Sequence, residues 1–185
     1  MIKPWKTISS KTLGDFRVFK VRSEAKQSPR TGETHDFYVI DSSNWVNVIA
    51  VTPANELVMI DQYRHASNTV ELEAPGGIID PEDASPIAAG VRELREETGY
   101  EGSSAKLIGE FFPNPALQTN TCYTVLIENC RYAGPVQFDL TEDLLTRLVP
   151  VAEIPSLVRE GKIRHALVLN ALFYFDLWRR QGGEE

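Results

Sequence analysis

The first third of the chain alternates between apolar and polar residues, a pattern that predicts β-strands. The alternation runs through Phe16–Val21 and again through His35–Ile40, and a period of two is typical of a strand with one buried face. Ser28–Gly32 lies between them and is rich in turn-forming residues, so the two strands are expected to form a hairpin. Two apolar runs of core-strand length follow, at Trp45–Val51 and Leu57–Tyr63.

A helix is predicted near the middle of the chain. Ser85 suits an N-cap, Pro86 suits the first helical position, Ala88–Thr98 is rich in helix formers, and Gly99 is placed to end the helix. Further strand-like and helical segments follow at Ala105–Phe111, Thr121–Ile127, Ile154–Arg159 and Ala166–Trp178. The last segment is apolar nearly all round, which predicts burial in the core or in an interface.

The order of these elements predicts a mixed α/β sandwich, because strands flank one central helix and precede C-terminal helices. A length of 185 residues suits one domain with a small appendage. We therefore expect a β-rich region at 1–42 and a main domain at 43–185.

The composition is that of an ordinary globular protein, with 42% hydrophobic and 24% charged residues. A net charge of −7 argues against nucleic acid as a partner, but it allows a nucleotide substrate because a bound cation reverses the local charge. No apolar run approaches the roughly 20 residues of a membrane span, and the first residues lack the apolar core of a signal peptide. Cys122 and Cys130 form no disulfide framework, so a reduced cytoplasmic protein is expected.

The predicted central helix carries three glutamates on one face. Glu93, Glu96 and Glu97 stand at i, i+3 and i+4, and like charges at this spacing destabilise an isolated helix. A hard divalent cation such as Mg²⁺, which prefers oxygen ligands, would compensate them. The alternative is a solvated acidic face paired with Arg92 and Arg95.

The residues around these glutamates favour the metal site. Upstream, Val70–Asp80 contains a Pro-Gly-Gly sequence that lets the backbone approach a phosphate or a metal closely. Together with Arg92–Tyr100 this segment resembles the Nudix box: Gly, five residues, Glu, seven residues, then Arg-Glu-apolar-x-Glu-Glu-x-Gly-apolar. The second half matches residue for residue. The resemblance implies a pyrophosphohydrolase with a Nudix-type α/β/α sandwich, a mixed sheet and an N-terminal antiparallel hairpin region.

The first half of the box departs from the family pattern. Counting back from Arg92 puts Ala84 at the position of the first glutamate, whereas counting forward from Gly77 puts Asp83 there. The loop is thus one residue longer than the pattern, and Glu82 and Asp83 are its available acids. An insertion in a loop is readily tolerated.

The resemblance also implies a metal site for Mg²⁺, with Mn²⁺ as the alternative. The carboxylate ligands that it implies are Glu93, Glu96 and Glu97, and the last two also count as catalytic. Gly77 would supply backbone near the metal, with Ala74 or Gly76 contributing a carbonyl. Arg92 would orient the helix through an ion pair.

Segments outside the box resemble ADP-ribose and nucleotide-sugar pyrophosphatases. Asp61–Arg64 and Glu71–Gly77 are similar to their Gln-Tyr-Arg and Glu-Leu-Pro-x-Gly segments. Pro115, sixteen residues beyond Gly99, lies near the position of a subgroup proline. Arg64 is either a charge-assisted contact to a substrate phosphate or a surface arginine at a strand end.

Three further residues are candidates for substrate binding or catalysis. Trp45 either stacks on a base or packs in the core. Tyr38 lies in the N-terminal hairpin, which in this family often exchanges across a homodimer and contacts the nucleobase. Glu142, in an acidic loop before the strand-like Thr146–Pro150, is the first candidate for general base, with Asp143 second.

The expected reaction is metal-dependent hydrolysis of ADP-ribose or a nucleoside diphosphate sugar such as GDP-mannose, which yields a nucleoside monophosphate and a sugar phosphate. One alternative is a Nudix hydrolase of dinucleoside polyphosphates or nucleoside triphosphates. A second is a ligand-sensing Nudix domain without catalysis, and a third is isoprenoid diphosphate isomerisation, which would need a catalytic thiol. Neither Cys122 nor Cys130 lies in a motif for that role.

Overall fold

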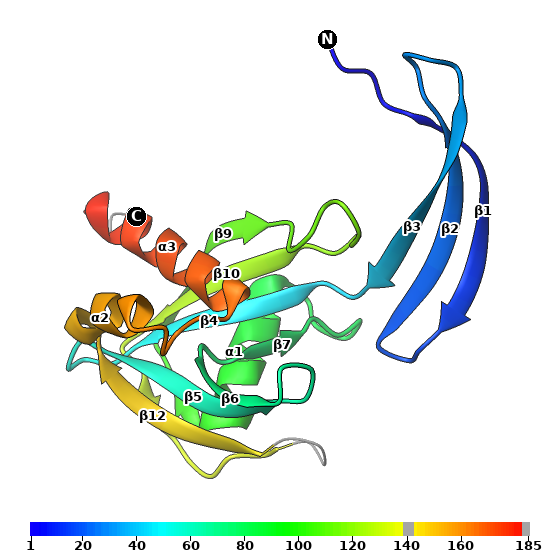
Figure 1. Cartoon of the computed structure of the whole chain (residues 1–185). Coiled ribbons are helices and arrows are strands. Elements are labelled where there is room, and N and C mark those ends of the chain that lie inside the picture. The colour runs from blue at the N-terminus through cyan, green and yellow to red at the C-terminus, as the bar shows by residue number, and fades with distance from the viewer. Residues whose placement is uncertain (139–142, 183–185) are drawn as a thin grey trace. The chain divides into compact units, whose positions relative to one another are not determined.

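The computed structural model describes residues 1–138 and 143–182. By their internal contacts these residues form two compact units, Met1–Asn44 with Phe112–Thr121, and Trp45–Phe111 with Cys122–Glu185 (Figure 1). The segment Phe112–Thr121 belongs to the first unit because its backbone pairs with β3 (Thr34–Ser42), where Ile40 N donates to Leu117 O over 2.7 Å.

The first unit contains a three-stranded antiparallel sheet in the order β1-β2-β3. β2 (Phe19–Gln27) and β3 form the predicted hairpin, whose turn is closed by Gly32 N donating to Ser28 O. The predicted strand at Phe16–Val21 is wrong over its first three residues, which form the turn between β1 (Lys6–Asp15) and β2. β1 itself was not predicted because its exposed, mostly polar sequence carries no sustained hydrophobic alternation.

The second unit is built on a mixed sheet with the strand order β12-β5-β4-β10-β9. Its strands are β4 (Trp45–Val51), β5 (Glu56–Arg64), β9 (Ser104–Phe111), β10 (Cys122–Glu128) and β12 (Leu144–Pro150). β4 and β10 run parallel, whereas the other pairs in this order are antiparallel. β6 (Thr69–Glu73) pairs with β5 and β7 (Gly76–Ile78) with β4, and β8 (Tyr100–Glu101) and β11 (Arg131–Tyr132) form a separate small pair.

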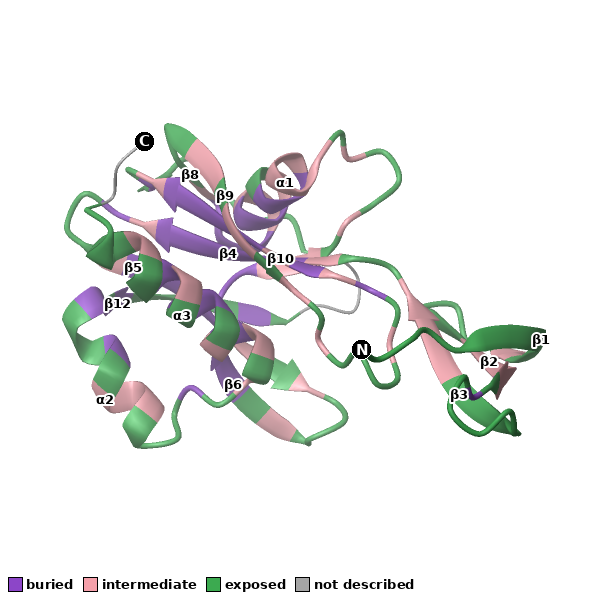
Figure 2. Cartoon of the chain, turned by 90° about the horizontal axis from the view of Figure 1, so that it is seen from above, coloured by how far each residue is buried: buried purple, intermediate pink, exposed green. Residues whose placement is uncertain are grey.

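Helices cover both faces of this sheet (Figures 1 and 2). α1 (Pro86–Thr98) packs on one face, where Val48, Val58, Leu94 and Val125 belong to one apolar cluster. A second cluster lies on the other face, under α2 (Ile154–Arg159) and α3 (Ala166–Arg180), and a 3₁₀ turn at Val151–Glu153 precedes α2. This arrangement confirms the predicted α/β/α sandwich.

The bounds predicted for α1 are confirmed by its capping contacts. Ser85 Oγ accepts a hydrogen bond from Ala88 N over 3.1 Å, which satisfies one free N–H of the first turn. Gly99 ends the helix at a φ of 73°, and a Cβ atom there would lie 2.1 Å from Gly134 O. Only glycine can therefore end α1 in this way.

The expected burial of the last helix holds for one face of α3 only. Val168, Ala171, Leu172 and Phe175 are buried, whereas Phe173 on the other face is 58% exposed. No helix among the described residues is long and apolar enough to cross a membrane.

Candidate active site

Two of the three glutamates on the acidic face of α1 lie against the backbone of β7. Gly76 N donates a 2.9 Å hydrogen bond to Glu97 Oε2. A Cβ atom on Gly77 would lie 2.5 Å from Glu93 Oε1, so this carboxylate rests directly on the glycine backbone. Glu93 and Glu97 are only 8% and 2% exposed, and the helix therefore does not present a simple solvated acidic face.

The Gly-Gly sequence is required by the contact between β7 and β4. Gly76 has a φ of 155°, and a Cβ atom there would lie 2.1 Å from Val46 O. No other residue type can occupy this position without moving β4. The absence of a side chain lets the backbone of β7 approach β4 closely on one side and the carboxylates of α1 on the other.

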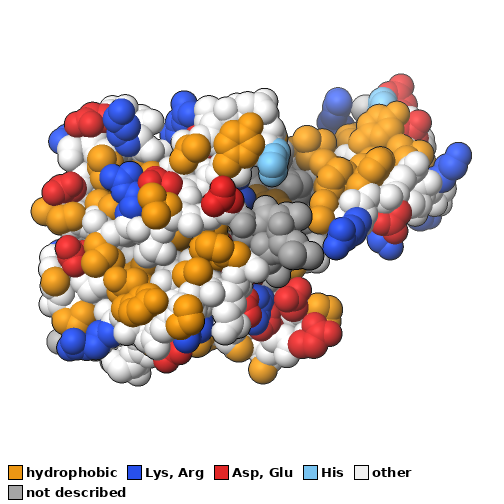
Figure 3. Space-filling model, turned by 90° about the horizontal axis from the view of Figure 1, so that it is seen from below, with side chains coloured by type: hydrophobic (Ala, Val, Ile, Leu, Met, Phe, Trp, Pro, Cys, Tyr) orange, Lys and Arg blue, Asp and Glu red, His pale blue; other side chains and the backbone are white. Residues whose placement is uncertain are grey.

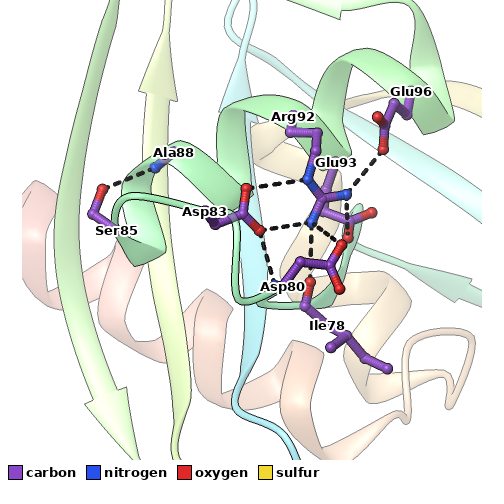
Figure 4. Close-up of polar contacts among 8 residues, drawn as sticks. All are labelled: Ile78, Asp80, Asp83, Ser85, Ala88, Arg92, Glu93 and Glu96. Carbon is purple, nitrogen blue, oxygen red and sulfur yellow. Dashed lines mark hydrogen bonds and ion pairs between the residues drawn. The ribbon is translucent and has the colours of Figure 1, made fainter.

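Arg92 links the acidic face of α1 to the loop before it (Figure 4). Its Nη1 lies 3.0 Å from Glu93 Oε1 and 2.9 Å from Glu96 Oε2. Its Nη2 donates to Ile78 O over 3.1 Å and to Asp83 Oδ2 over 2.9 Å. The hydrogen bonds that Arg92 donates to Asp83 are the first cause that raises the pKa of Arg92, so the guanidinium stays charged. The ion pairs expected of Arg92 are therefore present.

Asp83 is the acid of the longer loop that contacts α1. It binds Arg92 through both carboxylate oxygens, accepts a 2.9 Å hydrogen bond from Asp80 N, and donates from its own N–H to Asp80 O. The hydrogen bonds from Arg92 lower the pKa of Asp83. Glu82 is exposed. Asp83, and not Glu82, is therefore the loop acid that pairs with α1.

The oxygen donors at α1 fit a hard divalent cation. In the described part of the chain, no three His, Cys, Asp or Glu side chains are already grouped to hold an ion. Glu96 pairs with Arg92, and Glu97 accepts a hydrogen bond from Gly76 N. Nearby N–H groups and the guanidinium compensate the negative charge of these carboxylates, and a bound divalent ion would compensate the same charge.

A second polar cluster surrounds Arg64 at the end of β5. Its Nε and Nη2 each donate a 2.8 Å hydrogen bond to one oxygen of Glu73, which is buried at the end of β6. His165 Nδ1, at the start of α3, lies 3.2 Å from Glu73 Oε2. Glu73 was not among the site residues predicted from the sequence, although its alternation with Glu71 on a short strand is a usable signal.

The other predicted site residues lie in several parts of the molecule. Ala74 packs in the cluster under α2 and α3, so a contact to a metal would fall to its backbone. Trp45 is half-buried at the start of β4, opposite Ile78 of β7. Tyr38 and Pro115 are exposed and belong to the first unit. Glu142 lies outside the described residues.

The two cysteines carry no sign of reactive chemistry. Cys122 and Cys130 are both buried and free. Burial raises the pKa of Cys122 to about 12 and that of Cys130 to about 11. Because the thiolate is the nucleophile, these side chains are inert near neutral pH. This argues against the isomerase alternative.

Comparisons with known proteins agree with the fold and with the motif. The NUDIX domain family model matches residues 43–172. An ADP-ribose pyrophosphatase of Mycobacterium tuberculosis is 26% identical over 89% of this chain and 80% of its own length. A methanol dehydrogenase activator of Bacillus methanolicus is 32% identical over 93% of this chain and 92% of its own.

A solved structure has the same type of fold. The crystal structure of an ADP compounds hydrolase superposes with a TM-score of 0.87 at 20% identity, and the match covers 99% of this chain and 98% of that one. At this identity the likeness shows the shared fold. Nudix hydrolases generally need divalent metal ions, in keeping with the oxygen donors of α1. The chain therefore belongs to the Nudix family, as a pyrophosphohydrolase similar to the ADP-ribose pyrophosphatases.

Proposed function

We propose that this enzyme hydrolyses the diphosphate linkage of ADP-ribose or of a nucleoside diphosphate sugar such as GDP-mannose. The products are a nucleoside monophosphate and a sugar phosphate. The observation that carries the proposal is the contact of Glu93 and Glu97 with the Gly76–Gly77 backbone, which joins a carboxylate face to a close-approach backbone. The names of the relatives support this substrate class over free nucleoside triphosphates.

The metal of this reaction would be Mg²⁺ or Mn²⁺. The residues that would hold it are Glu93, Glu96 and Glu97, with backbone near Gly77. When bound there, a divalent ion screens the phosphate charge and lowers the pKa of bound water. The protein holds these carboxylates in place. The 2.9 Å hydrogen bond from Gly76 N holds one Glu97 oxygen, and Arg92 holds Glu93 and Glu96.

The remaining roles fall to residues outside α1. Arg64 binds a phosphate of the diphosphate bridge through charge-assisted hydrogen bonds. A loop acid, Glu142 or its neighbour Asp143, takes the proton from the attacking water, a step worth roughly 10²–10⁴-fold in rate. Trp45 of the second unit contacts the nucleotide, and Tyr38 and Pro115 are the candidates for substrate binding in the first unit.

We propose that two copies of this chain form a homodimer. In the first unit, all of which the structure describes, no apolar residue is buried, although it contains Trp5, Phe19 and Phe37. Figure 3 shows hydrophobic side chains exposed over this unit. A three-stranded sheet with both faces open needs further packing to be stable in water.

The test is turnover of a substrate panel with and without Mg²⁺, using wild type, Glu97→Gln and the exposed control Glu82→Gln. The panel contains ADP-ribose, GDP-mannose, UDP-glucose, a diadenosine polyphosphate and dGTP. We expect metal-dependent monophosphate release from the first three, its loss in Glu97→Gln, and near-normal rates in Glu82→Gln. Activity confined to the last two substrates would reject the proposed class, and binding of ADP-ribose without turnover would favour a sensor.

A further inference from the structure

Strand β6 carries two buried glutamates that each hold an arginine from another part of the chain. Glu71 and Glu73 are 7% and 1% exposed, and as alternate residues they point to the same side of the strand. Their intervening neighbour Leu72 packs in the apolar cluster on the other side. Buried carboxylates are costly unless they are paired, so each must have a charged or hydrogen-bonding partner.

Glu73 pairs with Arg64 in a bidentate geometry. Both oxygens accept 2.8 Å hydrogen bonds, one from Nε and one from Nη2, and the carboxylate is almost fully enclosed. Two parallel hydrogen bonds to an enclosed partner fix the plane of a guanidinium group and not only its position. Arg64 keeps 41% of its side chain exposed, so its fixed plane is presented at the surface of the unit.

Glu71 forms a comparable pair with Arg164. Its oxygens accept from Arg164 Nε and Nη2 at 2.7 to 3.1 Å, and Thr69 Oγ1 adds a further hydrogen bond. This pair joins β6 to the residues just before α3, 93 positions later in the chain. The two glutamates are thus similarly buried, and each binds one arginine through both carboxylate oxygens. Glu73 also lies 3.2 Å from His165 Nδ1, whereas Glu71 also accepts from Thr69 Oγ1.

Glu73 differs from Glu71 in lying next to the segment that contacts α1. Glu73 is the last residue of β6 and precedes the segment Ala74–Gly77, whose Gly76 N binds Glu97. The guanidinium of Arg64 is therefore tied to the same short segment that contacts the carboxylates of α1.

We propose that Glu73 is a positioning residue that fixes the guanidinium plane of Arg64 for contact with the substrate diphosphate. The inference rests on the proposed function, in which Arg64 binds that diphosphate. A guanidinium that is already held in place loses less side-chain entropy on binding than one that must be ordered. Glu73 thus strengthens substrate binding without touching the substrate, whereas Glu71 stabilises the fold alone.

The test compares Glu73→Gln with Glu71→Gln, each in the full chain, alongside Arg64→Ala and the double variant Arg64→Ala/Glu73→Gln. Binding of ADP-ribose to the metal-free protein is measured by calorimetry, KM and kcat are measured with Mg²⁺, and thermal unfolding is recorded for every variant. We expect Arg64→Ala to weaken binding about 10- to 100-fold, the range for a hydrogen bond to a charged group. Glu73→Gln should weaken it about 3- to 10-fold with KM rising more than kcat falls, as for a partial loss of that bond.

Two comparisons distinguish positioning from a structural effect. Glu71→Gln should lower thermal stability while the affinity stays within about twofold of wild type, because its arginine is not the substrate contact. In the Arg64→Ala background, Glu73→Gln should change binding no further. Equal loss of affinity in Glu71→Gln and Glu73→Gln, or a full effect of Glu73→Gln in the absence of Arg64, would overturn the inference.

Arg64→Lys tests the same inference if Glu73→Gln does not fold. Lysine keeps the charge but cannot be held through two donors of a fixed plane, so affinity should fall nearly as far as in Arg64→Ala. Wild-type affinity in Arg64→Lys would contradict the need for a fixed plane. Because binding is measured without metal, a protein that binds ADP-ribose but does not hydrolyse it would reject the proposed reaction and still test the role of Glu73.

Discussion

At the scale of single residues, the candidate site depends on two glycines of β7, whose backbone lies against both β4 and the carboxylates of α1. The backbone of Gly76 donates to Glu97, and that of Gly77 supports the carboxylate of Glu93. Arg92 and Asp83 complete the arrangement by tying the helix to its preceding loop. The positions of the carboxylates are therefore set by the close approach of the glycine backbone and by ion pairs with Arg92.

Gly76→Ala should destabilise the protein by on the order of 3 kcal/mol, because the new Cβ would meet the backbone of β4 at a φ unfavourable to alanine. Thermal unfolding measures this effect. Gly161→Ala is the control, since Gly161 also has a positive φ of 67° but no atom within 4 Å of the added Cβ. The control should cost only about 1 kcal/mol. Equal losses in the two variants would show that the contact with Val46 O is unimportant.

Asp83→Asn should raise the Mg²⁺ concentration needed for half-maximal turnover about tenfold or more, the usual range for a partner of metal-binding residues. The physical reason is that a neutral amide holds Arg92 less firmly, and Arg92 holds Glu93 and Glu96. A metal titration of ADP-ribose turnover measures the change. Glu82→Gln, at the exposed neighbouring acid, should behave as wild type, and an equal shift there would contradict the assignment of Asp83.

At the scale of elements, β6 connects the candidate site to the C-terminal helix. Glu73 holds Arg64 of β5, and Glu71 holds Arg164, which lies just before α3. Apolar contacts on the opposite side of β6 join the cluster under α2 and α3. Polar pairs on one side and hydrophobic packing on the other thus fix this short strand.

The pair formed by Glu71 predicts a specific acid dependence of stability. Hydrogen bonds from Arg164 are the first cause that lowers the pKa of Glu71, from 4.5 to about 2. Because the folded-state pKa is depressed, the stabilisation is complete above pH 4.5 and is lost as the pH falls toward 2. Glu71→Gln should therefore be less stable than wild type at pH 6, and the difference should narrow toward pH 2. A constant difference in unfolding temperature across this range would reject the assignment.

At the scale of the whole molecule, the two units differ in how they bury apolar surface. The second unit has two apolar clusters, one on each face of its sheet. The first unit has no buried apolar residue, and its buried side chains are the polar Glu24, Ser28 and Asn120. An open sheet of this kind is stabilised by association with further surface.

The protein should therefore have about twice the mass of one chain in solution, because a homodimer is the commonest way to cover such a surface. Light scattering after size-exclusion chromatography measures the mass. Phe37→Asp, on the exposed side of β3 where Phe37 contacts Trp5, should shift the mass toward one chain. Leu145→Asp, at an exposed residue of β12, is the control. A monomeric wild type would reject the proposed partner.

The sequence by itself determined the elements whose signals are local. The caps of α1 and the apolar runs of β4, β5 and α2 depend on neighbouring residues, so periodicity and capping were sufficient to find them. The Nudix box could be recognised because its carboxylates lie close together in the sequence, on one face of one helix. The exposed strand β1 carried no such pattern and was missed.

The tertiary structure decided which distant charges meet. The pairing of Arg64 with Glu73, the pairing of Glu71 with Arg164, and the choice of Asp83 over Glu82 all depend on strand register and loop path. The assignment of Phe112–Thr121 to the first unit likewise required its contact with β3. Such contacts join residues far apart in the chain, and hydrophobic periodicity describes only the environment of each residue and not its partner.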